Sequence, residues 1–596
     1  SFEGEQNPKW SRGPNTYFLV SPGTTKEALM AKMQVVGDEY FNSRFFRDQE
    51  GNSTFTPRLI RYDDIHLKSQ FTSGISPTGD IRYVYLFSSI AILILVIACV
   101  NYINLATAKS LKRSKETGLR KVIGADRSQL LKLYITESIV LTSISVLVAF
   151  AIAERILPYY NDLIDRDIEL SYGSVEIFFT VIVINFLVGF LAVLYTALKL
   201  SNAKPVDAIR GEKAPGGKRM VRRGLVLFQF FVAQMLIVIT IVIQSQLSYL
   251  QNKDLGYNRE QALYIKTHQE LKGRGDVFKE AIDKIPNVAL SAYSNGIFTR
   301  AAISFFNINK VEGHEESQTN DLVIADLFDG SPTFIDVLEI ELIEGRNFDI
   351  EKQSDQAEAI IINEAAVKRF GWDEPIGKRL NKVWGTKDRY VIGVMKDFHN
   401  ESLRAEIKPT FVVLNKETTE YLNLRIRPED MSETLARVED AWNEMVPDRP
   451  IEYTFYDDKF EEHYKGEERL GNFFFIFAAL AIGISLLGLI GLTAFTAEQR
   501  LKEIGIRKVL GASMRQLMLL LSKEFVVMSV IAFVIVIPIS YYVMEDWLTA
   551  FKYRVSIGVG VYSLAIVASI GVSWLVVCFQ SIKVARNNPA NILRTE

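Results

Sequence analysis

Hydrophobic and polar positions along this chain separate into long blocks. Apolar stretches of about twenty residues, the length that crosses the hydrocarbon core of a bilayer, alternate with polar stretches. Each apolar stretch predicts one membrane-spanning helix. Seven stretches meet this test, at approximately Leu86–Ala106, Leu133–Ile152, Phe178–Leu198, Gly224–Ile243, Phe473–Phe495, Phe525–Tyr542 and Ile557–Phe579.

The polar region 251–469 has shorter patterns. Ala359–Ile362 and Tyr390–Val394 are β-rich runs bounded by turn residues, which predicts strands. Val277–Ile285 and Met431–Met445 carry apolar residues at helical spacing, which predicts helices. Strands mixed with helices predict a compact α+β domain between two membrane spans.

One phrase occurs twice, each time just after an apolar span. Residues 113–125 read RSKETGLRKVIGA, and residues 500–512 read RLKEIGIRKVLGA. The ungapped alignment continues to Glu137 and Glu524. A related phrase closes each half, PVDAIR at residues 205–210 and PANILR at residues 589–594. Repeats at both ends of a unit predict a duplicated membrane protein.

Positive charge predicts the orientation of the spans, because loops rich in lysine and arginine stay in the cytoplasm. Both repeated phrases lie in basic loops, whereas the hairpin from Asp162 to Glu169 is acidic. The phrases are therefore expected to be cytoplasmic, and residues 1–82 and 251–469 to lie outside. Because no span precedes residues 1–82 and the chain starts at Ser1, we expect a truncated sequence that has lost a first helix and part of a domain.

Composition narrows the functional classes. The 596 residues are 48% hydrophobic and 23% charged, with a net charge of -2, so no bulk attraction to nucleic acid is expected. The two cysteines, Cys99 and Cys578, fall inside apolar spans and are interpreted as small hydrophobic residues.

The repeated phrases are the best candidates for a site. Their positive charge alone would fix topology, but it does not explain a glutamate and several glycines at identical spacing. A short helix ended by glycine would expose the glutamate and an Arg-Lys pair from adjacent turns. We therefore predict two protein-docking sites, formed by Glu116, Gly118, Arg120, Lys121, Gly124 and Ala125, and by Glu503, Gly505, Arg507, Lys508, Gly511 and Ala512.

Polar residues inside the spans allow two interpretations. They hydrogen-bond to neighbouring helices, or they line a substrate path. The residues are Asn101, Asn104, Gln229 and Gln234. No span carries Asp or Glu near its middle, which argues against a proton relay and an ion-coupled transporter.

Catalytic and metal motifs are weak. Residues 211–219 resemble a phosphate loop, but the lysine is one place late and no Ser or Thr follows. The five histidines lack metal-ligand spacing. Asp397-Phe398-His399 suggests either a metal or acid–base pair or, more simply, a structural turn. We expect a non-catalytic chain with no metal and no cofactor of its own.

These residues carry a family likeness. The pattern E-x-G-x-R-K-x-x-G-A between two spans resembles the MacB/FtsX-type permeases of ABC transporters. Four phrases of the polar region resemble the MacB-like periplasmic core domain: EGRNF at 344–348, INEAA at 362–366, PIGK at 375–378 and VMKDFH at 394–399. The tandem form common in Bacteroidota, with two four-helix halves, is the most similar. This chain departs from that form by lacking a first helix and the start of a first periplasmic domain.

The resemblance implies a mechanism and partners. A separate cytoplasmic ABC ATPase dimer would bind ATP and dock on the loop between the second and third helices of each half. Its motion would pass through the inner membrane to periplasmic domains that act on cargo, with a periplasmic adaptor or outer-membrane protein as a further partner. The alternative within the resemblance is an FtsX-type regulator of a cell-wall hydrolase. Antibiotics, peptides and lipoproteins are equally compatible cargo.

The expected architecture is a multi-pass α-helical membrane protein with α+β extracytoplasmic domains and an internal duplication. The expected divisions are 1–82, the end of a first periplasmic domain; 83–200, a first transmembrane unit with coupling loop 108–132; 201–221, a linker; 222–250, the first helix of the second half; 251–469, a second periplasmic core domain; 470–583, a second transmembrane unit with coupling loop 497–516; and 584–596, a cytoplasmic tail.

Overall fold

The computed structural model of the chain describes most of its length. The described residues are 17–40, 59–65, 81–164, 167–170, 173–202, 217–267, 271, 273–298, 302–315, 321–383, 387–400, 403–415, 420–499, 503–504, 506–507 and 510–585. They divide into two compact units. We call residues 90–254, 403–406 and 460–596 the membrane unit, and residues 1–89, 255–402 and 407–459 the core unit.

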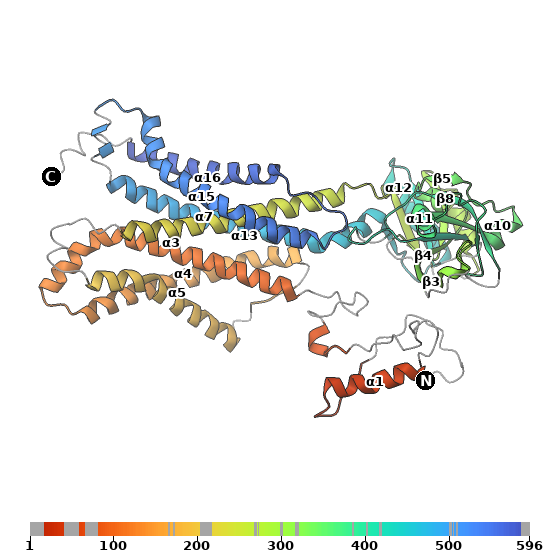
Figure 1. Cartoon of the computed structure of the whole chain (residues 1–596), viewed down its shortest axis with the longest axis horizontal. Coiled ribbons are helices and arrows are strands. Elements are labelled where there is room, and N and C mark those ends of the chain that lie inside the picture. Colours follow the sequence, from red (N-terminus) through yellow and green to blue (C-terminus); the bar gives the residue numbers. More distant parts are fainter. Residues whose placement is uncertain are drawn as a thin grey trace. The chain divides into compact units, whose positions relative to one another are not determined.

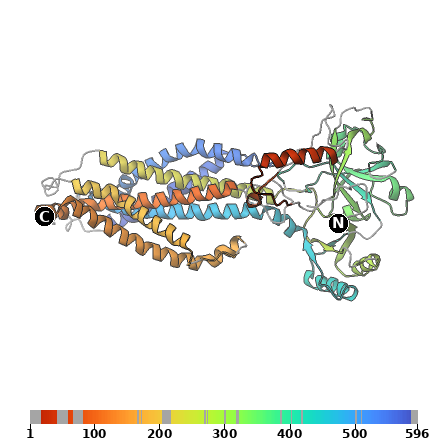
Figure 2. The same ribbon diagram turned by 90° about the horizontal axis from the view of Figure 1, so that it is seen from below.

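Long helices make up the membrane unit. Figures 1 and 2 show them running alongside one another. In chain order they are α3 (Ile81–Val122), α4 (Arg127–Ile164), α5 (Val175–Asn202), α7 (Gly217–Gln251), α13 (Tyr456–Gln499), α15 (Met514–Leu548) and α16 (Val559–Ala585).

Six of the seven predicted spans lie within these helices, and the seventh, Ile557–Phe579, begins two residues before α16. Among the described residues, five helices contain apolar segments long enough to cross a bilayer: α3, α4, α7, α13 and α15. In α5 and α16 the apolar segments within the described residues are shorter, Val175–Phe190 and Val559–Gly571. Pro538 lies inside α15 without ending it. Membrane helices tolerate proline when neighbouring helices satisfy the backbone groups that it leaves unbonded.

Polar side chains connect helices of the membrane unit. Gln234 of α7 is fully buried, and its Nε2 lies 2.8 Å from the hydroxyl oxygens of Ser529 on α15 and Ser569 on α16. Asn101 of α3 donates to the carbonyl oxygen of Ile484 on α13 at 3.1 Å. Gln229 of α7 donates to the carbonyl oxygen of Ile97 on α3 at 3.5 Å. The hydrogen-bonding interpretation is supported for Asn101, Gln229 and Gln234, whereas Asn104 is only known to be buried.

Helices α3 and α13 approach each other closely at glycines. A Cβ atom on Gly488 would lie 2.3 Å from Oδ1 of Asn101, and one on Gly491 would lie 2.0 Å from Cδ2 of Leu105. Asn101 and Gly488 are equivalent in the ungapped alignment of the two repeats. Contact between equivalent positions is what a pseudo-two-fold axis between the halves produces.

The described part of the core unit is built on one sheet of eleven strands. Its strand order is β11-β1-β10-β2-β4-β9-β6-β8-β5, with β3 beside β4 and β7 beside β8; β4 with β9 and β6 with β8 are parallel pairs. The strands are β1 (Ala262–Lys266), β2 (Val288–Ser294), β3 (Ala302–Asn307), β4 (Leu322–Gly330), β5 (Leu342–Gly345), β6 (Ala359–Asn363), β7 (Arg379–Leu380), β8 (Arg389–Met395), β9 (Thr410–Leu414), β10 (Tyr421–Ile426) and β11 (Tyr453–Phe455).

Short helices also belong to the core unit. They are α1 (Lys26–Tyr40), the 3-10 turns η2 (Tyr62–Asp64) and η4 (Ile308–Lys310), and α8 (Gly275–Asp283), α9 (Phe334–Val337), α10 (Gln353–Glu358), α11 (Glu364–Phe370) and α12 (Met431–Met445). The two strands and two helices predicted from the sequence are confirmed as β6, β8, α8 and α12. Most of residues 1–82 lies outside the described residues, so a first periplasmic domain there stays a prediction.

Two apolar clusters form the interior of the core unit. Phe278 of α8 and Trp442 of α12 meet edge to face, with ring centroids 5.7 Å apart, over β1, β10 and β2. Phe370 of α11 packs beside Phe411 of β9 in the second cluster, over β6 and β8. Strand β6 is buried at every position, which explains its continuous apolar run in the sequence.

One buried carboxylate connects α10, the short helix before β6, to the segment that follows β5. Asp355 is almost fully buried, and its two carboxylate oxygens accept hydrogen bonds from the Arg346 guanidinium. The hydrogen bond from Arg346 holds the pKa of Asp355 below its usual value of 3.8. Because the pKa of Asp355 is lower in the folded state than in the unfolded state, the interaction adds stability at pH values above 3.8. This stability is lost as the pH falls through the lowered pKa of the folded state.

The substitution Asp355→Asn should lower the stability of the core unit by about 2 kcal/mol, because it leaves Arg346 without its charged partner. Hydrogen exchange of the β6 and β8 amides in the intact chain measures this loss. The matched control is Asp321→Asn, which removes a bidentate Arg369 pair exposed on both sides and should cost about 0.5 kcal/mol. Equal effects of the two variants would contradict the role of burial.

The substitution Gln234→Leu should lower the thermal unfolding temperature of the membrane unit, because it removes side-chain bonds to α15 and α16. The expected loss is about 1 kcal/mol, in the range of hydrogen bonds between membrane helices. Gln244→Leu, at an exposed position of α7, is the control and should have little effect. Equal melting temperatures for wild type and Gln234→Leu in detergent would count against this contribution.

Candidate docking site on the repeated loops

The first repeated loop is a helix end closed by glycine. Helix α3 ends at Val122, and Gly124 follows with φ +102°. The Ala125 amide donates to the carbonyl of Arg120 at 3.0 Å, and the Gly124 amide donates to the carbonyl of Lys121 at 3.1 Å. These are the two hydrogen bonds of a Schellman motif, in which glycine adopts the left-handed conformation without steric cost.

The second repeated loop has matching geometry. Gly511 has φ +88°, and the Ala512 amide donates to the carbonyl of Arg507 at 2.9 Å. Ser513 then caps helix α15 in a reciprocal box with Gln516, at 2.9 and 3.3 Å. Asp126 and Gln129 stand at the same two positions of the first loop, with the Asp126 amide donating to the Gln129 side chain at 3.2 Å.

The predicted short helix takes a different form in the first loop. Residues 113–122 are the end of α3 itself, which continues for 42 residues without a break. No Gly-Pro or other strong helix breaker separates this phrase from the span, so the helix propagates through it. In the second loop the described residues Glu503, Ile504, Ile506 and Arg507 are helical.

Exposed apolar side chains mark the same positions in both loops. Leu119 and Ile123 are 58% and 78% exposed, and their equivalents Ile506 and Leu510 are 52% and 79% exposed. Apolar residues grouped at the end of a helix and flanked by charge are typical of a protein interface. We call these four residues the apolar pairs; inspection of the sequence missed them because they continue the hydrophobic pattern of the helix.

Charged residues flank the apolar pairs. Arg507 and Glu503 form an ion pair of 2.8 Å one helical turn apart, with both side chains about half exposed. Arg120 and Lys121 lie in the last turn of α3. Glu116 and Gly118 belong to α3 but their side chains lie outside the described ones, as do Gly505 and Lys508 entirely.

Buried residues anchor the second loop to the membrane helices. Ile504 and Leu517 are buried in one cluster with Val226 of α7, and Ala512 packs against that cluster. Leu130, the equivalent of Leu517, is buried in the first loop. The buried residues of the loop contact the helix bundle, whereas the apolar pair is exposed. A displacement of the exposed residues would therefore also move the membrane helices.

A long-range ion pair lies near the second loop. Arg223 of α7 pairs with Glu524 of α15 at 2.7 Å. Glu524 is the last residue of the aligned repeat, matched by Glu137 in the first half. The sequence showed the repeated glutamate, but its partner lies 301 residues away and no local spacing identifies it.

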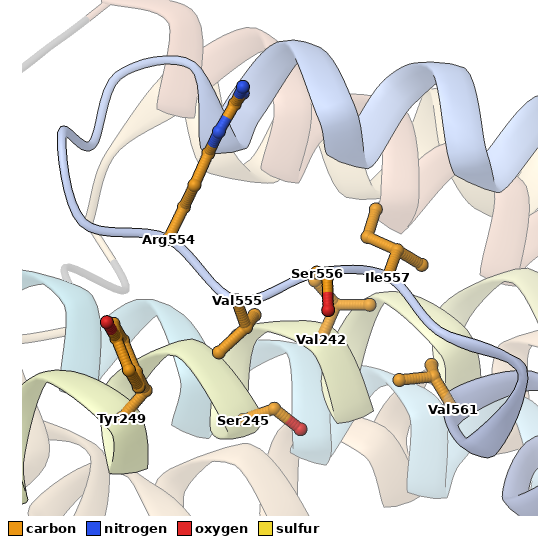
Figure 3. Close-up of a pocket in the computed structure, with 8 residues that line it drawn as sticks. All are labelled: Val242, Ser245, Tyr249, Arg554, Val555, Ser556, Ile557 and Val561. Carbon is orange, nitrogen blue, oxygen red and sulfur yellow. The ribbon is translucent and has the colours of Figure 1, made fainter.

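A pocket of about 480 Å³ lies elsewhere in the membrane unit, between α7 and the loop that leads into α16. Figure 3 shows Tyr249 and Ser245 on α7 and Arg554 on the loop. Arg554 is already paired with Glu545 at 3.1 Å. The other lining residues are Ser556 and four apolar residues, Val242, Val555, Ile557 and Val561.

The Asp397-Phe398-His399 motif has a structural role. Asp397 Oδ1 accepts hydrogen bonds of 2.8 Å from the Asn363 side chain and from the Ala365 amide. Burial raises the pKa of Asp397, and Phe398 lies in an aromatic cluster. Within the described residues, no group of three or more His, Cys, Asp or Glu side chains could hold a metal ion.

Two family profiles match the chain. The profile described as FtsX-like permease C-terminal matches twice, at residues 88–205 and 475–589, and so finds the duplication independently. The profile described as MacB-like periplasmic core domain matches once, at residues 235–443. The sequence led us to expect two such domains, the end of a first one at residues 1–82 and a second one at residues 251–469, and the profile finds one.

Known proteins show partial similarity. A macrolide export ATP-binding/permease protein, MacB from Bdellovibrio bacteriovorus, is 32% identical over 127 residues, which is 21% of this chain and 19% of that protein. The chain thus matches about a fifth of that relative's length.

Two solved domains are also similar. The periplasmic region of MacB from Actinobacillus actinomycetemcomitans is 12% identical, with a TM-score of 0.25 over 36% of this chain and 96% of that one. A domain of a putative permease from Porphyromonas gingivalis is 19% identical, with a TM-score of 0.23 over 33% and 89% of the two chains.

The substitution Gly511→Ala should weaken the end of the second loop, because a Cβ atom is strained at φ +88°. The expected cost of about 1 kcal/mol should speed exchange of the Ala512 amide hydrogen about fivefold. Gly558→Ala is the control, since Gly558 lacks a positive φ and a Cβ there meets nothing within 4 Å. Unchanged exchange at Ala512 would contradict the Schellman geometry.

Proposed function

Because this chain belongs to the FtsX-like permeases with a MacB-like periplasmic core domain, we propose that it is the membrane subunit of an ABC-type export or extraction complex. The two repeated loops are the docking sites of a separate ATPase dimer. ATP-driven motion of that dimer passes through the membrane helices to the core domain, which acts on cargo outside the membrane.

The observation that carries this proposal is the matched surface of the two loops. Both loops close with a left-handed glycine turn, and each presents one apolar pair beside an arginine. Two equivalent surfaces suit a partner that is itself a symmetric dimer. Basic charge in both loops supports a cytoplasmic position, where ATP is available.

We also propose that ATP is hydrolysed by a different chain from the one that forms the permease. The name of the Bdellovibrio relative assigns ATP binding and permease to one protein. The profiles matched here are those of permease and periplasmic domains, which supports a second chain as the source of ATP hydrolysis. We also propose an inner-membrane location in which residues 251–469 lie outside the cytoplasm. Residues 1–82 are proposed to be the end of a first core domain.

Reversing the charges of the second loop tests the docking role. Glu503→Lys or Arg507→Glu should reduce co-purification of the ATPase at least tenfold, because each places the wrong charge beside the apolar pair. Both single variants also break the Glu503–Arg507 ion pair. The double variant Glu503→Arg/Arg507→Glu keeps an ion pair but exchanges the two charges, and it should still fail to bind.

Controls separate docking from folding. The matched exchange Glu433→Arg/Arg437→Glu on α12, where the pair has the same i,i+4 spacing at 2.7 Å, should leave ATPase binding unchanged. Undiminished co-purification of the Glu503 and Arg507 variants would reject the docking role. Labelling of Lys115 and Lys502 from the periplasmic side of intact cells would reject the orientation.

A regulator of a cell-wall hydrolase is the competing function. Two measurements distinguish an exporter from such a regulator. Stimulation of ATP hydrolysis by cargo supports export or extraction, whereas capture of a hydrolase by the core domain of the full chain supports regulation.

A further inference from the structure

The pocket of about 480 Å³ in the membrane unit takes no part in the docking proposed for the repeated loops. Its volume lies within the range of small-molecule sites, roughly 300–1,000 Å³. One wall is a face of α7, on which Val242, Ser245 and Tyr249 follow one another at helical spacing. The other wall is residues 554–557, between α15 and α16, together with Val561 at the start of α16.

The pocket lies where the membrane spans end. The apolar segment of α7 extends to Gln251 and that of α15 to Leu548, and the apolar segment of α16 begins at Val559. The lining residues therefore lie at the level where hydrocarbon gives way to lipid headgroups. Tyr249 and Trp547 belong to the same level, and such aromatic residues prefer the boundary between membrane and water.

A buried glutamine holds the two walls together. Gln246 of α7 donates from Nε2 to the carbonyl of Tyr553 at 2.9 Å, and its Oε1 accepts from the Val555 amide at 2.8 Å. One side-chain amide thus fixes the two residues on either side of Arg554. The wall is formed before any ligand arrives, and a preformed site binds at a lower cost in conformational entropy.

The interior of the pocket is apolar on both walls. Val242 is buried, and Val555, Ile557 and Val561 are half-buried. Figure 3 shows Val555 turned toward α7, whereas Arg554 points the other way. An apolar space between membrane helices suits a hydrocarbon chain, because chain and lining gain contacts without burying a polar group.

The side of the pocket formed by α16 is uncrowded. A Cβ atom on Gly558 or on Gly560 would meet nothing within 4 Å. Val559, between these two glycines, is 82% exposed. A hydrocarbon chain can therefore enter from this side.

Two opposite charges lie beside the apolar interior. The Arg554 guanidinium pairs with the Glu545 carboxylate at 3.1 Å, and both side chains are about 40% exposed. The Lys253 ammonium lies 4.3 Å from the ring centroid of Tyr553 and 5.7 Å from that of Tyr249, so these rings already engage it. The guanidinium and the carboxylate each have more hydrogen-bonding positions than one ion pair uses.

We propose that the pocket binds one phosphatidylethanolamine molecule of the surrounding bilayer. One acyl chain lies between α7 and the segment that joins α15 to α16. The Arg554 guanidinium donates hydrogen bonds to the phosphate, whose geometry it fits, and the Glu545 carboxylate accepts from the ammonium group. A headgroup with one charge of each sign matches this ion pair, whereas a purely anionic headgroup would face Glu545.

Native mass spectrometry of the full chain tests the proposal, with titrations of phosphatidylethanolamine and phosphatidylglycerol that carry the same acyl chains. No ATPase is needed, so the result is independent of the docking function. Wild type should bind one phosphatidylethanolamine with an affinity about fivefold above that for phosphatidylglycerol, the range of an exposed ion pair.

The substitution Arg554→Ala should lower the affinity for phosphatidylethanolamine about tenfold, because charge-assisted hydrogen bonds to the phosphate are lost. Arg223→Ala is the matched control. Arg223 is also half exposed and ion-paired, but it lies at the other end of α7. An equal loss in both variants would contradict a specific role of Arg554.

The substitution Glu545→Gln gives a readout that loss of folding would not produce. It removes the negative charge and leaves Arg554 without its charged partner. The affinity for phosphatidylglycerol should therefore rise until it equals or exceeds that for phosphatidylethanolamine. An unchanged ratio of the two affinities would contradict the match between headgroup and ion pair.

Filling the pocket tests the position of the acyl chain. Val561→Trp should abolish retention of the lipid, whereas Leu564→Trp, at a position of α16 that is 59% exposed outside the pocket, should not. Thermal unfolding checks that both variants are folded. If Val561→Trp unfolds, the Arg554 and Glu545 variants still decide.

Three results would overturn the proposal. They are retention of detergent only, equal affinities of wild type for the two lipids, and equal effects of Val561→Trp and Leu564→Trp. A diacylated peptide without a phosphate group, added as a competitor, should displace phosphatidylethanolamine only weakly. Tighter binding of that peptide would assign the pocket to acylated cargo and would overturn the proposal as well.

Discussion

A backbone that crosses lipid must satisfy its own hydrogen bonds, and the structure of the membrane unit depends on this constraint. It makes each apolar block a continuous helix and removes the hydrophobic effect as a force between helices. A few polar and small residues then decide how the helices meet. Gln234 connects three of them, and Gly488 allows α3 and α13 to approach closely.

The same constraint explains why the helix ends matter. A helix that leaves the bilayer must stop at a defined residue if its end is to present a fixed surface. The left-handed glycines Gly124 and Gly511 provide that stop, and the carbonyls of Arg120 and Arg507 are satisfied by the turn that follows. Identical backbone turns place the apolar pairs and the arginines of the two loops alike.

Much of this arrangement could be predicted from the residues. Apolar length predicted the spans, and the duplicated phrase located both loops with their glycine ends. Short β-rich runs bounded by turn residues predicted β6 and β8, because these signals are local in the sequence. The apolar pairs were not predicted, because Leu119 and Ile506 continue the hydrophobic pattern of the helix. The ion pair between Arg223 and Glu524 was not predicted, because the two residues lie 301 positions apart in the sequence.

Asn101 and Gly488 meet at equivalent places in the two repeats. A homodimer must put the same residue on both sides of its symmetry axis, so it would pair two asparagines or two glycines there. Fusing both halves into one polypeptide lifts that requirement. A large side chain on one half can then occupy the space left by a missing one on the other, and the halves are free to take on different tasks.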